Sequence, residues 1–175
     1  LLRDREWLHS MLSEKKVQFV FAGKAHPHDV FGQALIQELV KTGQDYPGQV
    51  VFIPNYDMNL GALLTRGVDV WLNNPIRPKE ASGTSGMKAA ANGVLNLSIL
   101  DGWWAEGCQH GLNGWGVGAP PKDVDADQHD YEALRNLIEQ DVLPAYSNTA
   151  AWVEMMQTSI SSSQVQFSSN RCVQR

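Results

Sequence analysis

A segment near the middle of the chain combines groups that can hold an anion and condense with an aldehyde. It runs Glu80-Ala81-Ser82-Gly83-Thr84-Ser85-Gly86-Met87-Lys88 and holds one carboxylate, two glycines, three hydroxyls and one lysine. Thr84 and Ser85 are predicted N-caps of a helix that runs to Ala91. Because the unpaired N–H groups and the positive dipole end of a helix start favour an anion, the segment predicts a phosphate site.

Lys88 is the candidate reactive group of this segment. We expect it in the first turn of the helix, where burial and the helix dipole both disfavour a charged amine. A neutral amine is the form that condenses with an aldehyde. The alternative is an ordinary capped turn followed by a solvated lysine. Neither a Walker A loop nor a Gly-x-Gly-x-x-Gly turn after the first strand is present, so the sequence does not favour ATP or NAD.

Alternating strands and helices must position this segment. The pattern predicts strands at 17–22, 50–53, 68–72 and 94–100, and helices at 1–12, 29–41, 58–66, 84–91, 131–143 and 149–160. Alternation of this kind is typical of parallel crossovers, so we expect a Rossmann-like, doubly wound α/β fold with a mainly parallel sheet. Ligands of such folds bind at the carboxyl ends of the strands, which here precede the loops after Ile53, Leu72 and Leu100.

Two stretches carry no predicted element. Residues 101–118 are rich in glycine and tryptophan and predict a long loop, a kind of connection that is often functional. Ser161-Ser162-Ser163 predicts fraying or a linker, with a frayed tail over 161–175. Residues 1–175 are expected to form a single α/β domain. The start at Leu1 and the polar end lead us to expect a piece of a longer protein.

Composition and charge narrow the classes of function. The chain has 14 basic and 19 acidic residues and a net charge of −5, which disfavours a nucleic-acid-binding module. No apolar run approaches the roughly 20 residues of a membrane span, and the first residues lack the layout of a signal peptide. We therefore expect a cytoplasmic protein without nucleic-acid or membrane partners. Cys108 and Cys172 are too few for a disulfide framework and are expected to be plain thiols.

Four smaller features favour structural interpretations over functional ones. Lys24 follows a predicted strand and is expected to pair on the surface rather than bind phosphate. His26-x-His28 predicts a loop or an N-cap, and no metal site, because no further ligands are spaced nearby. Trp103-Trp104 predicts packing under a loop in preference to stacking on sugar rings. Cys108-x-His110 is expected to be incidental.

The segment 80–88, followed by Asn92-Gly93, closely resembles the pyridoxal-phosphate signature of the α-glucan phosphorylases, the glycogen, starch and maltodextrin phosphorylase family. The resemblance extends to 21–27, 53–58, 69–75 and 101–104, covers most of 17–118, and recurs near 167–171. Ala91 and Asp57 depart from the usual family residues. The resemblance implies that the chain is part of the C-terminal domain of a two-domain, glycosyltransferase-B type fold.

The resemblance also implies roles for individual residues. Lys88 matches the lysine that is covalently linked to pyridoxal 5′-phosphate, and Thr84 and Ser85 match the loop that holds its phosphate. Tyr56 matches an aromatic residue beside the cofactor. The stretch that hydrogen-bonds the hydroxyls of the transferred glucosyl unit is matched by Glu80, Ala81, Ser82 and Gly83. The implied catalytic residues are Lys88 and Glu80, and no metal is implied.

The activity that the resemblance implies is phosphorolysis of glycogen or maltodextrin, with inorganic phosphate collecting glucose 1-phosphate. The family supplies basic side chains for the phosphates from a segment that would precede this chain, and the other wall of the cleft from an N-terminal domain. We therefore expect the chain alone to be inactive. The resemblance also implies that the parent enzyme is a homo-oligomer. Two alternatives remain open: a non-catalytic sugar or phosphate binding module, and a nucleotide-sugar glycosyltransferase domain.

Overall fold

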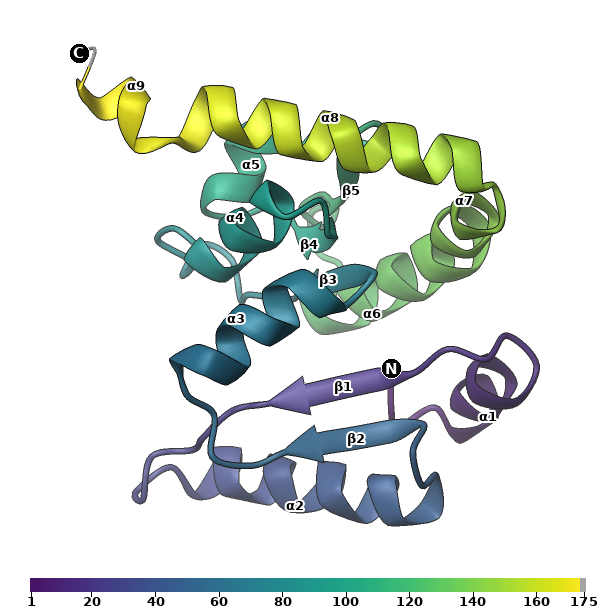
Figure 1. Ribbon diagram of the computed structural model, residues 1–175. Coiled ribbons are helices and arrows are strands. Elements are labelled where there is room, and N and C mark those ends of the chain that lie inside the picture. The colour runs from purple at the N-terminus through teal and green to yellow at the C-terminus, as the bar shows by residue number, and fades with distance from the viewer. Residues whose placement is uncertain (174–175) are drawn as a thin grey trace. The chain divides into compact units, whose positions relative to one another are not determined.

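The computed structural model describes residues 1–173, with the side chains of Asn170 and Cys172 outside the description. The chain divides into two compact units, Leu1–Gly61 and Ala62–Arg175. Each is a mixture of helices and parallel strands (Figure 1). A single domain over 1–175 stays a prediction, and the prediction for the Cys172 thiol lies outside the described residues.

The first unit pairs two parallel strands. Its elements are α1 (Arg5–Ser13), β1 (Phe19–Ala22), α2 (Val30–Asp45) and β2 (Val50–Ile53), followed by the start of α3 (Met58–Gly67). The register of the strands runs from Phe19 opposite Val50 to Ala22 opposite Ile53. Leu8 and Leu12 of α1 are buried against Val50. Asp29 caps α2, because its carboxylate accepts a hydrogen bond from Gly32 N at 2.8 Å.

The second unit contains a three-stranded parallel sheet. The strands are β3 (Val70–Asn73), β4 (Leu95–Ile99) and β5 (Gly114–Val117), in the order β3-β4-β5. The helices are α4 (Thr84–Ala91), α5 (Trp103–Gly107), α6 (Ala126–Leu137), a π-helical segment η1 (Ile138–Val142), α7 (Leu143–Ser147), α8 (Thr149–Phe167) and α9 (Ser169–Val173). Every residue of the central strand β4 is buried, as expected for a strand covered on both faces.

The long loop predicted at 101–118 is wrong in part, because the segment contains α5 and β5. Trp104 and Trp115 are almost fully buried, and the indole N–H of Trp104 donates to the Trp115 carbonyl at 2.9 Å. Gly114 lies so close to the Asn96 carbonyl that a β-carbon would overlap it. Gly114, which lets this strand approach β4, and Gly116 also weaken the sequence signal of the strand, since glycine has low strand propensity.

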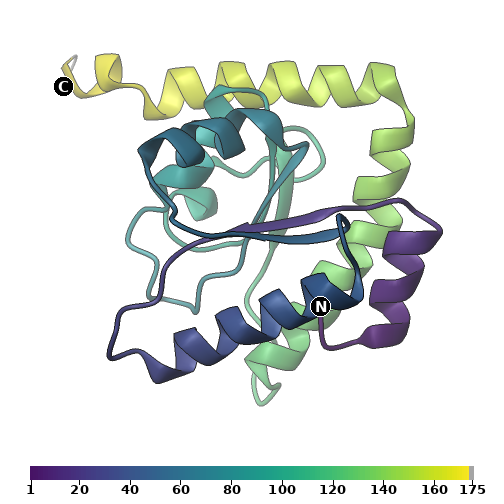
Figure 2. The same cartoon turned by 60° about the horizontal axis from the view of Figure 1, so that its bottom comes forward.

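The fraying predicted at Ser161–Ser163 is also not found, because α8 continues to Phe167. The three hydroxyls donate to carbonyls of their own helix, as Ser163 does to Ile160 at 2.9 Å. Ser159 and Ser163 are buried. Both views show α8 running alongside α4 and α5 (Figures 1 and 2). Burial of this face keeps the serine-rich turns helical.

The remaining elements agree with the sequence pattern to within a few residues. The helix predicted at 131–143 begins earlier, at Ala126, because Asp125 caps it by accepting from Gln128 N at 2.8 Å. All observed strand pairs are parallel, as predicted. Within residues 1–173, no helix combines the length and the apolar character needed to cross a bilayer.

Candidate functional site

The site begins where α4 begins, at Thr84. The N-cap is Gly83, which takes a left-handed conformation with φ of 86° and gives no side-chain hydrogen bond to the helix. The prediction of Thr84 and Ser85 as N-caps is therefore wrong by one and two residues, since they are the first two helical residues. The consequence is that the first amides of α4 have no side-chain cap. Gly86 N donates to the Gly83 carbonyl at 3.1 Å, so the Thr84 and Ser85 amides are the ones that can serve another acceptor.

Two glycines allow the start of α4 to lie against the sheet. A β-carbon at Gly86 would lie 2.7 Å from Asn96 Oδ1 and 2.9 Å from Trp103 Nε1. At Gly83 it would lie 3.1 Å from Trp103 Cδ1, in addition to the strain of the positive φ. Asn96, buried on β4, donates from Nδ2 to the Gly86 carbonyl at 3.1 Å. Asn96 on β4 and Trp103 on α5 thus fix the start of α4.

The loop that precedes α4 is fixed by residues that follow β4. The Asp101 carboxylate accepts a hydrogen bond from Glu80 N at 3.0 Å, and the Trp103 N–H donates to the Ser82 carbonyl at 2.9 Å. Gly102 has a φ of 53°, and a β-carbon there would lie 2.7 Å from Ser82 O. The backbone from Glu80 to Gly83 is therefore held at both ends, while Glu80 itself is half-buried and Ala81 is exposed.

Lys88 lies in the last turn of α4 and is exposed. The expectation of a buried lysine in the first turn is wrong, because α4 begins at Thr84 and has only eight residues, which puts Lys88 in its last turn, and the side chain is exposed. At this position the negative end of the helix dipole favours a cation. Lys88 nevertheless follows Thr84 by four residues and Ser85 by three, so the three side chains share one side of the helix.

Arg77 ties the segment before Glu80 to the rest of the second unit. Its guanidinium donates to both oxygens of Asp130 on α6, at 2.9 and 3.0 Å, and to the carbonyls of Val117 and Gly118 at 3.1 and 2.6 Å. Burial alone would raise the pKa of Asp130, but the hydrogen bonds from Arg77 and His129 outweigh it and hold that pKa below its usual value.

Three residues that the sequence analysis singled out, Tyr56, Asp57 and Lys24, lie in the first unit. Tyr56 is half-buried, and its hydroxyl is so close to Gly61 that a β-carbon there would lie 2.6 Å away. Asp57 accepts from Leu60 N at 2.8 Å, at the start of α3. Lys24 is exposed in the loop after β1. The structure thus brings together the predicted residues from Glu80 to Lys88, while Tyr56 belongs to the other unit.

The smaller motifs take structural roles. Trp103 and Trp104 are buried, and Trp103 packs edge-on against Phe167 with ring centroids 5.2 Å apart, which confirms the packing interpretation. His26 accepts from His28 N at 3.2 Å in the turn that leads to α2. In the described part of the chain, no group of three or more His, Cys, Asp or Glu side chains is placed to hold a metal ion. Burial raises the pKa of Cys108 to about 11, so its thiol is unreactive at neutral pH.

Sequence reasoning did not assign three residues that position this site. Asn96 supports α4, Asp101 holds Glu80, and Arg77 anchors the preceding segment. The available signal was an Asp-Gly pair directly after a predicted strand, at the carboxyl edge where such sites lie. No pattern along the chain indicated the Arg77–Asp130 pair, since the partners are 53 residues apart.

Comparison of the chain with known proteins identifies its family. A family model described as carbohydrate phosphorylase matches residues 6–109, which include the entire Glu80–Lys88 segment. The chain belongs to the carbohydrate phosphorylase family. It is 46% identical over 167 residues to a glycogen phosphorylase of Aquifex aeolicus, covering 91% of this chain and 24% of that protein. It is 43% identical over 181 residues to a maltodextrin phosphorylase of Thermococcus litoralis, covering 99% of this chain and 22% of that protein.

Two solved structures illustrate the fold of the chain. A C-terminal domain of a group 1 glycosyl transferase from Francisella tularensis has a TM-score of 0.62 and 22% identity, over 94% of this phosphorylase-family chain and 78% of that one. An Anabaena protein, HepE, solved with UDP and glucose, has a TM-score of 0.63 and 18% identity, over 99% and 43%. These likenesses confirm the predicted α/β fold. The chain spans about a quarter of the length of the curated phosphorylases it matches.

Proposed function

We propose that the chain is the coenzyme-bearing part of an α-1,4-glucan phosphorylase, which uses inorganic phosphate and pyridoxal phosphate to release glucose 1-phosphate from glycogen or maltodextrin. The observation that carries the proposal is the start of α4, where uncapped amides, two hydroxyls and an exposed lysine amine lie on one helix. Membership of the carbohydrate phosphorylase family supports it.

The residues at the start of α4 fit the two ends of pyridoxal phosphate. Thr84 and Ser85 offer their hydroxyls and their amides to a phosphate ester, with no side chain competing as a cap. The positive end of the helix dipole adds roughly 0.3–1 kcal/mol for an anion at an exposed site. Lys88, one turn further along, is the amine for the aldehyde. When bound, the coenzyme supplies a second phosphate beside the substrate phosphate.

The loop before α4 is suited to binding sugar hydroxyls. Asp101 holds the backbone of Glu80, and the Glu80 carboxylate is a strong acceptor for the hydrogen bonds of hydroxyls. Ala81, Ser82 and Gly83 present backbone groups from the same fixed loop. In phosphorolysis the bond from the glucosyl C1 to the glucan oxygen breaks, a bond from C1 to a phosphate oxygen forms, and a phosphate proton passes to the departing oxygen. Hydrogen bonds from this loop would orient the sugar for that exchange.

The proposal is tested by coenzyme binding to single-lysine variants. The protein is incubated with pyridoxal phosphate, and the absorbance of the bound coenzyme is measured after removal of free coenzyme. We expect stoichiometric binding that is lost in Lys88→Ala. The matched control is Lys79→Ala, because Lys79 is an exposed lysine of the same loop. Equal binding by Lys88→Ala and the wild-type protein would contradict the assignment of Lys88.

The two alternative functions would give no covalent coenzyme in this assay and are told apart by the binding of other ligands. A non-catalytic sugar or phosphate module would bind maltodextrin or phosphate and form no covalent link to the coenzyme. A nucleotide-sugar glycosyltransferase domain would bind UDP-glucose tightly without pyridoxal phosphate. We expect neither result, because the family that the chain belongs to is named for phosphorolysis of carbohydrates.

A further inference from the structure

A cavity of about 460 Å³ lies in the second unit, at the opposite end of the sheet from the Glu80–Lys88 loop. Its lining includes Val68 and Asp69, which precede β3, and Gly93 and Val94, which precede β4. These positions are the amino ends of parallel strands, whereas Glu80 to Lys88 follow the carboxyl end of β3. The cavity has the volume of ordinary small-molecule sites, which is roughly 300–1,000 Å³.

One side of the cavity is a fixed aromatic pair. Trp152 on α8 and Tyr146 on α7 pack edge to face, with ring centroids 5.0 Å apart and an interplanar angle of 85°. Trp152 is also packed against Trp115 at 6.0 Å and is only 7% exposed, while Tyr146 is 52% exposed. The buried indole therefore fixes a tyrosine ring that presents half of its surface to a ligand.

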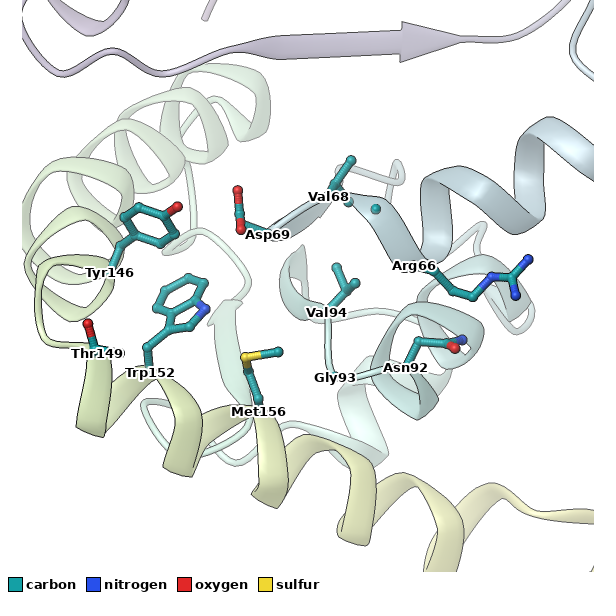
Figure 3. Close-up of a pocket in the computed structure, with 11 residues that line it drawn as sticks. Arg66, Val68, Asp69, Asn92, Gly93, Val94, Tyr146, Thr149, Trp152 and Met156 are labelled. Carbon is teal, nitrogen blue, oxygen red and sulfur yellow. The ribbon is translucent and has the colours of Figure 1, made fainter.

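The polar groups of the cavity carry both signs of charge. Figure 3 shows the Asp69 carboxylate and the Tyr146 hydroxyl on one side, and the Arg66 guanidinium and the Asn92 amide on the other. Val94 and Met156 lie between the two groups. The Arg66 Nε donates to the Ala62 carbonyl at 2.8 Å, which ties that side chain to its own helix. The cavity thus has an apolar floor between two polar rims, with one carboxylate and one guanidinium.

We propose that this cavity binds a neutral carbohydrate, a short α-glucan segment, at a site separate from the Glu80–Lys88 loop. A sugar ring has apolar C–H faces, which pack on Tyr146, Val94 and Met156, and hydroxyls that both donate and accept. Asp69 accepts from hydroxyls, the Arg66 guanidinium donates to them, and Asn92 can do either. The choice of an α-glucan as the carbohydrate rests on the proposed function.

The charge of the cavity argues against an anionic occupant. A phosphate or a nucleotide would lie beside the Asp69 carboxylate, whereas the Arg66 guanidinium on the other rim is tied to its own helix through Ala62 O. Both side chains are exposed, so water partly screens both charges. The start of α8, which borders the cavity at Thr149, already has a side-chain cap, because Asn148 accepts from Ala151 N at 3.3 Å. A neutral ligand with many hydroxyls avoids this repulsion and still satisfies both rims.

The test is calorimetric titration of the protein with maltotriose, and with inorganic phosphate as the anionic probe. We expect maltotriose to bind with a dissociation constant in the millimolar range. Asp69→Asn and Tyr146→Ala should each weaken binding by about tenfold, the effect of losing one hydrogen bond to a charged group or one aromatic contact. Asp127→Asn, the same change at an exposed aspartate of α6, should leave binding unchanged.

Other results would contradict either the carbohydrate site or the proposed function. Absence of maltotriose binding by a folded protein at millimolar concentration, or phosphate binding that Asp69→Asn strengthens, contradicts the carbohydrate site. Binding that is lost in Glu80→Gln but not in Asp69→Asn places the sugar at the loop instead. Maltotriose binding without coenzyme attachment to Lys88 contradicts the proposed function and leaves this site standing.

Discussion

Gly86 shows at the scale of a single residue how tightly the start of α4 is packed. Its α-carbon lies where a β-carbon would contact Asn96 and Trp103, and its carbonyl accepts from the Asn96 amide. Asn96 is itself almost fully buried on the central strand. A change at this glycine therefore displaces a buried polar group together with a buried ring, and it moves the amides that we propose bind phosphate.

We predict that Gly86→Ala lowers the free energy of unfolding by about 1–3 kcal/mol, the cost of overpacking a well-packed position. Gly67→Ala is the matched control, because a β-carbon at Gly67, also at a helical position, meets nothing within 4 Å. Urea denaturation of the two variants measures the difference. An unchanged stability of Gly86→Ala would show that α4 is not fixed against Asn96 and Trp103 as described.

The residue types of the segment 80–88 predicted the position of the helix but not its N-cap or the exposure of Lys88. Thr84 to Ala91 is the observed helix, but Gly83 is the N-cap because its left-handed conformation, and not a hydroxyl, turns the chain into the helix. Lys88 was expected to be buried, yet the short helix ends beside it and leaves it exposed. Burial depends on what packs around a residue, and the spacing of residues in one segment does not contain that information.

Arg77 and Asp130 act at the scale of elements, by linking the segment after β3 to the end of β5 and to α6. The pair is mostly buried, with side-chain exposures of 17% and 19%. The Arg77 guanidinium also satisfies the carbonyls of Val117 and Gly118. Loss of either partner would leave charged or polar groups without partners in a buried place, which costs more than the loss of a surface ion pair.

We predict that Asp130→Asn lowers the free energy of unfolding at pH 7 by about 1.5–3 kcal/mol, the range for hydrogen bonds to charged groups. The folded-state pKa of Asp130 lies below its unfolded value, so between the two values the unfolded chain binds more protons and stability rises with pH. The contribution is therefore present above about pH 4 and is lost as the pH falls through the folded pKa.

The measurement is urea denaturation of the wild-type protein, Asp130→Asn and the control Asp127→Asn at a series of acidic and neutral pH values. The difference between Asp130→Asn and the wild-type protein should shrink as the pH falls, whereas Asp127→Asn should follow the wild-type curve. A difference that stays constant with pH would mean that the ionised carboxylate of Asp130 does not provide the stabilisation.

Strands and helices were predicted correctly where the hydrophobic pattern was strong. They were missed where tertiary contacts override the local sequence preference. The apolar runs of β1, β2 and β4 and the helical periodicities of α2 and α3 gave elements that the structure contains. β5 was missed because Gly114 and Gly116 are poor strand formers, whereas in the structure Gly114 lets the strand approach the Asn96 carbonyl of β4. The Arg77–Asp130 link, between residues far apart in the chain, has no local signature.

The whole molecule consists of two α/β units and spans about a quarter of the length of the phosphorylases it matches. Phosphorolysis brings two phosphates together, and their repulsion requires more positive charge than one helix start supplies. We predict that the 175-residue chain loaded with pyridoxal phosphate releases no glucose 1-phosphate from maltodextrin and phosphate. A coupled assay for glucose 1-phosphate checks this, and turnover above the level of Lys88→Ala would contradict it.

The most direct test of the central claim is to locate the coenzyme on the chain. The protein is incubated with pyridoxal phosphate, reduced with borohydride, digested and mapped by mass spectrometry. The account predicts one modified residue, Lys88, with a modified peptide that is absent from Lys88→Ala and present in Lys79→Ala. Modification spread evenly over the exposed lysines, or a dominant adduct at another lysine, would contradict it.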